Sequence, residues 1–278
     1  MNIELYIPPN VAKQPLYQQY FTLLEEGLTA RSDMTLSTQF PQLIHVFGAW
    51  NAQTSKRITQ AHRQLIPTVY SPLGELAPWW FHQQEVRLSP TKLLAQKNAT
   101  KKATTVLVWG ENERRSIQQR QWSDRVALIP NPILTATITP QDCLEQLVTL
   151  YEQTILDHDQ RMRQAIVKKM TIIEEDAPLE KEFCTQVLYL RYQYHRRNIS
   201  KAALAQLATS LMTVDYDEDA LVQMLITLHE EKFAARILQL LEEDKQITEG
   251  FMPLNPLDDK HTKRLREAVN TTEQNTIK

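Results

Sequence analysis

The chain has 278 residues, of which 42% are hydrophobic and 23% charged, a composition typical of globular proteins and not of fibrous or disordered ones. At roughly 150 residues per domain, this length predicts two domains. No segment approaches the roughly 20 apolar residues of a membrane span. The first residues lack a secretory-signal pattern, and the two cysteines give no disulfide framework. We therefore expect a cytoplasmic protein.

The net charge of −2 hides an asymmetry between the two halves of the chain. Residues 1–138 contain 14 lysines and arginines against 9 acidic residues, whereas residues 139–278 contain 17 against 24. The basic first half includes a cluster at Lys97–Lys102, from which we expect weak peripheral contact with the anionic inner face of the membrane. The acidic second half argues against nucleic acid as a partner, although aromatic and basic residues alternate over Tyr189–Arg197.

Strand-like and helix-like segments alternate along the first half. Apolar, β-branched runs predict strands over residues 2–8, Leu43–Phe47, Ile66–Ser71, Ala103–Trp109 and Arg125–Ile129. Helical patterns occupy residues 15–30, 52–64, 90–101 and 111–121, and a short segment near 34–40 remains unassigned. This order is typical of βαβ units, so we predict a Rossmann-like parallel sheet over residues 1–138.

The pattern becomes helical after Pro140. Apolar residues from Leu144 to Ile166 recur at helical spacings and predict a long helix over 140–175. Further helices are predicted over residues 179–196, 200–213, 217–230 and 232–245. A loop over 252–260, a short polar helix and a mobile polar tail from Asn270 to Lys278 complete the chain. Residues 139–278 are therefore expected to form an all-α domain.

Glycine is scarce, and three of the five glycines directly follow strand-like runs. Gly48, Gly74 and Gly110 occupy these positions, where a sharp turn or a close backbone approach is expected. In an open parallel sheet such loops meet at the carboxyl edge, which is where ligands bind. The loops after Phe47 and Tyr70 are thus the first candidates for a functional site.

Three motifs in the first half resemble the N-terminal domain of family 4 glycosyltransferases, which have the two-domain GT-B fold. A strand in such domains often reads I-H-x-H-G-x-W, and here Ile44–Trp50 reads IHVFGAW. The next strand often reads V-x-S-P-H-G with a later P-W, and here Val69–Gly74 reads VYSPLG before Pro78-Trp79. The domain usually closes with I-P-N-G, where this chain has Ile129–Pro132. The resemblance covers about half of the chain.

The departures from the family pattern fall at positions that matter for chemistry. Phe47 replaces the second histidine of the first motif, and Leu73 replaces the histidine of the second. In the family that imidazole helps to position the reacting sugar, a role that leucine cannot take because it neither donates nor accepts a proton. Pro132 replaces the last glycine and restricts the backbone at the point where the chain leads toward a second domain.

The second half lacks the pattern of a nucleotide-sugar domain. The resemblance implies a second Rossmann-like domain with two glutamates at the donor site, yet Glu174 and Glu182 have Pro178 between them and no strand before them. The segment Leu144–Glu152 resembles the last helix of such enzymes, which crosses back onto the N-terminal domain. We infer that this crossover helix is kept while a helical domain replaces the donor domain.

A candidate cleft for an acceptor or another ligand follows from the two strand-end loops. Its residues are the polar, aromatic, glycine and substituted positions of these segments: His45, Gly48, Trp50, Asn51, Ser71, Leu73, Gly74, Glu75 and Trp79.

Each of these candidates also has a purely structural interpretation. His45 either contacts a ligand or is a core histidine with satisfied hydrogen bonds. Trp50, Trp79 and Trp80 either stack on a sugar ring or pack over the loop ends. Gly48 and Gly74 either expose backbone amides to a ligand or only allow turns. Ser71 lacks the G-x-S-x-G frame of a hydrolase nucleophile.

Two functional classes follow from these observations. The first is a glycosyltransferase-like protein of cell-surface polysaccharide synthesis, which binds an acceptor glycan or a lipid-linked glycan and acts only with a partner protein that supplies the donor site. The second is a pseudoenzyme that serves as a protein–protein interaction scaffold. Because Leu73 removes the imidazole and the donor domain is missing, we expect no transferase activity from the chain alone, no catalytic residues, no cofactor and no metal site.

Overall fold

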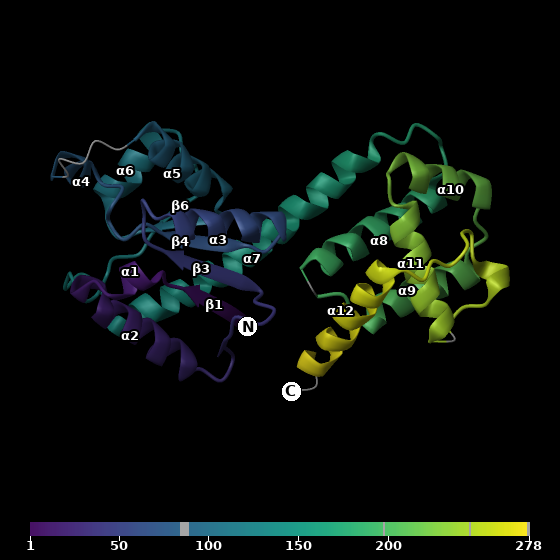
Figure 1. Cartoon of the computed structure of the whole chain (residues 1–278), viewed down its shortest axis with the longest axis horizontal. Coiled ribbons are helices and arrows are strands. Elements are labelled where there is room, and N and C mark those ends of the chain that lie inside the picture. The colour runs from purple at the N-terminus through teal and green to yellow at the C-terminus, as the bar shows by residue number, and fades with distance from the viewer. Residues whose placement is uncertain (84–88, 197, 245, 277–278) are drawn as a thin grey trace. The chain divides into compact units, whose positions relative to one another are not determined.

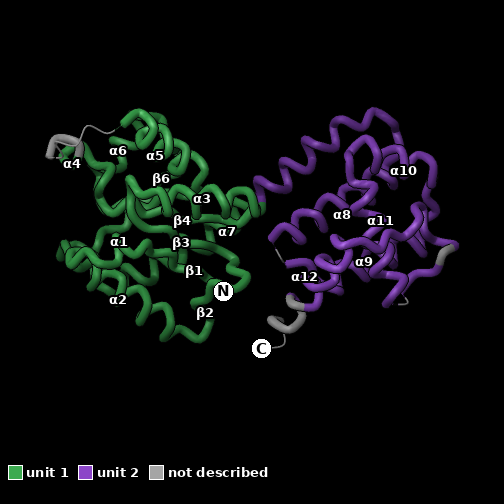
Figure 2. Tube along the Cα trace, viewed as in Figure 1, with its two compact units in different colours: residues 1–159 green, residues 160–278 purple. Residues whose placement is uncertain are grey.

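The computed structural model describes residues 1–83, 89–196, 198–244 and 246–276. The chain forms two compact units, Met1–Asp159 and Gln160–Lys278 (Figure 2). The boundary between them lies inside one helix, α7 (Pro140–Met170), and not at residue 138, where the sequence pattern changes. The first unit is α/β with a parallel sheet and the second is helical, which confirms the predicted fold class.

A six-stranded, fully parallel sheet with the order β2-β1-β3-β4-β5-β6 forms the centre of the first unit (Figure 1). Its strands are β1 (Asn2–Tyr6), β2 (Thr35–Leu36), β3 (Leu43–Phe47), β4 (Thr68–Ser71), β5 (Thr105–Val108) and β6 (Val126–Leu128). The five predicted strands are all present, and the unassigned segment near 34–40 supplies the short edge strand β2. The order reverses between β1 and β3, so their carboxyl ends form the topological switch point at which such sheets bind ligands.

Helices cover both faces of this sheet. They are α1 (Pro9–Ala12), α2 (Pro15–Thr29), α3 (Ala52–Arg63), α4 (Pro78–Gln83), α5 (Pro90–Lys102) and α6 (Glu111–Gln119). Side chains alternate along a strand, so Leu43 and Phe47 pack with α2 and the start of α7, whereas Ile44 and Val46 pack with α3, α5 and α6. Two apolar layers therefore enclose the sheet.

The first part of α7 packs on the sheet, as expected of a crossover helix. Leu147 and Tyr151 are fully buried in the same apolar cluster as Leu43 and Phe47. Gly27 brings α2 close to this helix, because a Cβ atom there would lie 2.3 Å from a methyl carbon of Leu144. The helix ends at Met170, five residues before the predicted end at 175.

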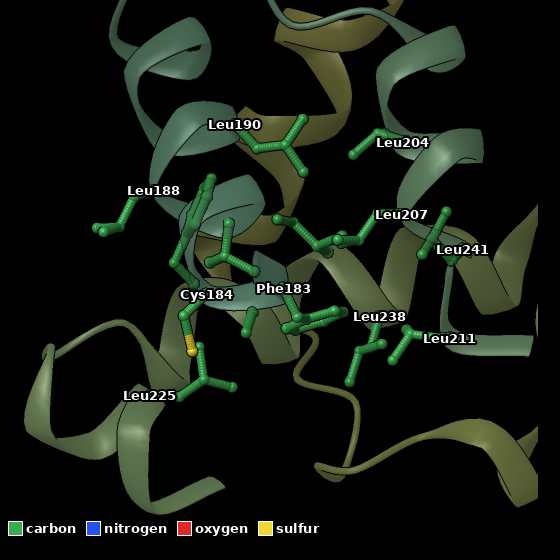
Figure 3. Packing of buried hydrophobic residues seen from close by; sticks show 14 of the residues in the cluster. Phe183, Cys184, Leu188, Leu190, Leu204, Leu207, Leu211, Leu225, Leu238 and Leu241 are labelled. Atoms are coloured by element: carbon green, nitrogen blue, oxygen red, sulfur yellow. The ribbon is translucent and has the colours of Figure 1, made fainter. Parts of the chain in front are cut away.

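The second unit is built from the last part of α7 and five further α-helices among the described residues. These helices are α8 (Pro178–His195), α9 (Lys201–Thr213), α10 (Glu218–Thr227), α11 (Glu231–Glu243) and α12 (Lys260–Thr276), with a 3₁₀ turn at Glu249–Phe251. Figure 3 shows their common core, in which Phe183 and Cys184 of α8 lie among leucines of α9, α10 and α11. No strand occurs in the described residues after 139, and no helix among them is long and apolar enough to cross a membrane.

Two features of the second unit bear on the sequence predictions: the extent of the last helix and the positions of Glu174 and Glu182. Helix α12 continues to Thr276, through most of the segment expected to be a tail, and residues 277–278 lie outside the described part of the chain. Glu174 lies in the exposed loop before α8, and Glu182 is exposed in the first turns of that helix. Neither glutamate follows a strand, so they do not form the strand-end pair of a donor site.

Candidate functional site

A buried chain of three polar side chains connects the sheet to helix α7. The His45 Nδ1 atom lies 2.6 Å from the hydroxyl oxygen of Tyr151, and its Nε2 atom lies 2.7 Å from the hydroxyl oxygen of Ser71. All three side chains are fully buried, and the Phe47 ring stacks on the imidazole at a centroid distance of 4.0 Å. Burial lowers the pKa of His45 to about 3, so the ring is neutral and has one donor and one acceptor nitrogen. Both nitrogens are engaged, which leaves none for a ligand.

The segments that follow β1 and β3 each place one asparagine at the switch point. The Asn51 side chain caps α3 by accepting a hydrogen bond from the backbone N–H of Gln53 at 2.7 Å. Its amide nitrogen donates to the Oδ1 atom of Asn10, at the start of α1, at 2.6 Å. Gly48 has a φ of 85°, and a Cβ atom there would lie 2.6 Å from Val11 Cγ2. The glycine therefore permits the close approach that brings these two loops together.

The loop after β4 turns through two consecutive left-handed residues. Leu73 has a φ of 62° and Gly74 a φ of 83°. A left-handed non-glycine residue costs about 1–2 kcal/mol, so the surrounding contacts must hold this conformation in place. Leu73 is only 3% exposed and its carbonyl oxygen accepts a hydrogen bond from the Tyr17 hydroxyl at 3.3 Å. Leucine thus points into the apolar layer where the family pattern has a histidine.

Glu75 follows this turn and joins the two strand-end loops. Its Oε2 atom accepts a hydrogen bond from the Ala49 N–H at 3.1 Å, and its Oε1 atom accepts one from the Tyr17 hydroxyl at 3.5 Å. The indole N–H of Trp50 donates to the Glu75 carbonyl oxygen at 3.1 Å. Burial raises the pKa of the Glu75 carboxyl to about 7, so the group is poised between its neutral and charged forms near neutral pH.

A second acidic side chain, Glu113 of α6, holds the same loop from the other side. The side chain is 2% exposed, and its Oε1 atom accepts a hydrogen bond from the Leu76 N–H at 3.0 Å. Burial raises the pKa of Glu113 to about 7, and the nearby charge of Glu75 adds to the rise. Among the described residues, its Oε2 atom has no hydrogen-bond partner. A buried acceptor of this kind requires a donor from water or from a ligand.

Aromatic side chains lie beside this acidic pair. Trp79 of α4 is 52% exposed, and a Cβ atom on Gly74 would lie 3.8 Å from its ring carbon Cζ2. The Trp50 ring stacks on Trp80 at a centroid distance of 5.3 Å. We use the name carboxyl-edge site for the group formed by Tyr17, Glu75, Trp79 and Glu113.

The predicted residues divide between this site and the core beneath it. The loops expose or position Gly48, Trp50, Asn51, Gly74, Glu75 and Trp79, whereas His45, Ser71 and Leu73 are enclosed in the apolar layer under α7. Sequence reasoning missed Tyr17 and Glu113. The one available signal for Glu113 was an acidic residue three positions after Gly110, at the start of a helix that follows a strand. No group of three or more His, Cys, Asp or Glu residues in the described part of the chain has a metal-binding arrangement.

Comparisons of this chain with models of protein families, with curated proteins and with solved structures give no match in any of the three. The resemblance to family 4 glycosyltransferases therefore rests on three short motifs. The structure shows a six-stranded parallel α/β unit followed by a helical region.

Proposed function

We propose that the α/β unit binds a glycan at the carboxyl-edge site, as a glycosyltransferase-like protein of cell-surface polysaccharide synthesis that transfers no sugar on its own. The acceptor would be a free or lipid-linked glycan. A partner protein would supply the donor site. The observation that carries the proposal is the pairing of two carboxyl groups with an exposed tryptophan at the end of strand β4.

The chemistry of these side chains suits a ligand rich in hydroxyl groups. The Glu75 side chain is partly exposed and its carboxyl accepts only two hydrogen bonds within the protein, so it can accept a further one from a ligand. Sugar hydroxyls can donate such a hydrogen bond. The exposed face of Trp79 offers an apolar platform for the C–H face of a sugar ring. The carboxyl groups can therefore accept hydrogen bonds from the hydroxyls of a pyranose, while the aromatic ring packs against its C–H face.

The same residues argue against transfer by this chain alone. Leu73 cannot exchange a proton, and His45 uses both ring nitrogens for structural hydrogen bonds. The described residues after 139 form helices without a strand, so they do not build the glycine-loop nucleotide site of a Rossmann-like fold. Binding without catalysis is the function that these contacts support.

A second candidate is a pseudoenzyme that acts as a scaffold for protein partners. The observation in its favour is apolar exposure on the helical part of the chain, where Val167 is 64% and Ile172 is 59% exposed. Such a scaffold needs no ligand at the carboxyl-edge site, which separates the two candidates experimentally.

The test measures the binding of oligosaccharides to the full chain by saturation-transfer NMR and by calorimetry. The panel contains neutral and acidic oligosaccharides and nucleotide sugars. We expect at least one oligosaccharide to bind, and both Glu75→Gln and Trp79→Ala to weaken it by about tenfold, the effect of one hydrogen bond to a charged group or one stacking contact. Glu25→Gln and Leu16→Ala, two exposed positions on α2, serve as matched controls. Absence of oligosaccharide binding, or equal weakening by the controls, contradicts the proposal.

A further inference from the structure

A cavity between three helices of the second unit is a separate candidate for ligand binding. It measures about 560 Å³ and lies between the last part of α7, the middle of α8 and the start of α9. Pockets for small molecules typically measure about 300–1,000 Å³. This volume is sufficient for one small molecule, whereas a docked helix would need a groove several turns long.

The walls of the cavity are mostly apolar. Val167 of α7, Leu190 of α8 and Ala203 and Leu207 of α9 line it, and Val167 is 64% exposed at its rim. Leu190 and Leu207 are buried, so the apolar surface that a ligand would remove from water comes mainly from Val167 and the partly exposed Ala203.

The lining of the cavity contains one positively charged side chain. Arg163 is the single charged residue among the described residues that line the cavity. Its guanidinium carbon lies 5.8 Å from the centre of the Tyr189 ring, and no carboxylate of the described chain forms an ion pair with it. A guanidinium held against an aromatic ring, without an acidic partner, is ready to bind a carboxylate.

The inner wall also contains a buried acceptor without a donor. Gln193 lines the cavity, and its side-chain oxygen is buried and has no hydrogen-bond partner among the described residues. This atom is an acceptor, so it requires a donor such as water. The cavity therefore combines an apolar body, one cation and one unpaired polar atom.

We infer that this cavity binds a small amphipathic carboxylic acid, with its carboxylate on Arg163 and its apolar chain between α7, α8 and α9. The inference concerns the helical unit and does not depend on the proposed glycan site. The occupant that we commit to is a free acid, and not a membrane surface or a protein segment. Charge complementarity carries this choice, because the lining contains a cation and no acidic residue.

The experiment measures binding of decanoate to the full chain by calorimetry, below the concentration at which decanoate forms micelles. Decanol and decylamine have the same chain with a neutral and a positive head, and they report the contribution of charge. We expect decanoate to bind at least tenfold more tightly than either. Arg163→Gln is expected to remove this preference, and Arg163→Lys to keep part of it. Equal binding of the three compounds, or no binding of decanoate, overturns the inference.

Two further variants separate the cavity from the surrounding surface. Ala203→Phe places a ring in the cavity and is expected to abolish binding of decanoate and decanol alike, with circular dichroism as the check on folding. Arg163 is exposed, so Arg163→Gln tests the site even if Ala203→Phe fails to fold. Arg264→Gln, an exposed arginine on α12, is the matched control and is expected to leave binding unchanged. Binding to phosphatidylglycerol vesicles that depends on Arg163, without decanoate binding, would assign the cation to a lipid surface and overturn the inference.

Discussion

The Nδ1 atom of His45 lies 2.6 Å from the hydroxyl oxygen of Tyr151, which joins strand β3 to helix α7 across 106 residues of sequence. On its other side the imidazole bonds to Ser71, so two elements of the sheet and one helix share a single ring. The three side chains lie in an apolar layer without access to water. An unmade hydrogen bond in such a layer costs about 1–3 kcal/mol, so this contact is expected to stabilise the α/β unit.

The first prediction concerns the hydroxyl of Tyr151. Tyr151→Phe removes it and leaves one imidazole nitrogen unpaired, which should lower the free energy of unfolding by about 1–3 kcal/mol. The five tryptophans lie between residues 50 and 122, so tryptophan fluorescence during urea denaturation reports on the α/β unit alone. Tyr6→Phe is the control, because Tyr6 ends strand β1 and its ring lies under the guanidinium of Arg57 from α3. If the two variants lose equal stability, the His45–Tyr151 bond has no special role.

The second prediction concerns the backbone at Gly48. Gly48→Ala combines a φ of 85° with a Cβ atom 2.6 Å from Val11 Cγ2, so we expect it to destabilise the unit by about 1–3 kcal/mol. Gly110→Ala is the matched control, because it also follows a strand but a Cβ atom there would meet nothing within 4 Å. Thermal unfolding followed by fluorescence compares the two. A Gly48→Ala variant as stable as Gly110→Ala would show that the α1 loop moves aside freely.

The third prediction concerns pH and the buried carboxyl of Glu113. Its pKa is raised from 4.5 to about 7, so the folded state holds this proton more tightly than the unfolded state. The resulting stability is complete below pH 4.5 and is lost as the pH rises through 7. Glu113→Gln removes this titration. Between pH 5 and pH 8 the wild type should therefore lose about 2 kcal/mol relative to the variant.

Urea denaturation at several pH values checks this sign. His45 has the opposite effect, because its pKa falls from 6.5 to about 3 and acid therefore destabilises the fold below pH 6.5. Both proteins contain His45, so its contribution cancels in the difference between them. A difference that stays constant with pH, or grows on acidification, would contradict the assignment of the raised pKa to Glu113.

The fourth prediction concerns where the chain can be divided. The fragment 1–159 contains the complete first unit, including the buried face of α7, and should fold with a cooperative unfolding transition. The fragment 1–138 lacks Leu147 and Tyr151, which exposes the apolar layer beneath α7 and leaves the Nδ1 atom of His45 without its partner. We expect that fragment to bind a hydrophobic dye and to aggregate. Equal folding of the two fragments would show that α7 is dispensable for the first unit.

The fold was predictable because its signals are local. The run Leu43–Phe47 is apolar throughout, as expected of a strand covered on both faces, and β3 has the predicted bounds. Helical periodicity likewise located α7–α11 to within a few residues, apart from the end of α7. The edge strand β2 has two residues, too few to produce any periodic pattern, so it remained unassigned.

The candidate site was only partly predictable, because its contacts are long-range. Glycines and strand ends indicated the two loops that contain Gly48 and Glu75. No sequence pattern connects Glu75 with Glu113 or Tyr17, since these residues meet only when α2 and α6 pack at the same edge of the sheet. The composition change near residue 138 marks a change of secondary structure, yet the first part of α7 belongs with the sheet because its apolar stripe faces it.

The hydrogen bonds of the His45 ring to Ser71 and Tyr151 also limit how the sequence of this fold can diverge. Replacing the imidazole with an aliphatic group would orphan two hydroxyls at once, whereas replacing either hydroxyl first would orphan only one nitrogen. Epistasis among the three positions should therefore make the order of substitutions matter, with the histidine exchanged last on any viable mutational path.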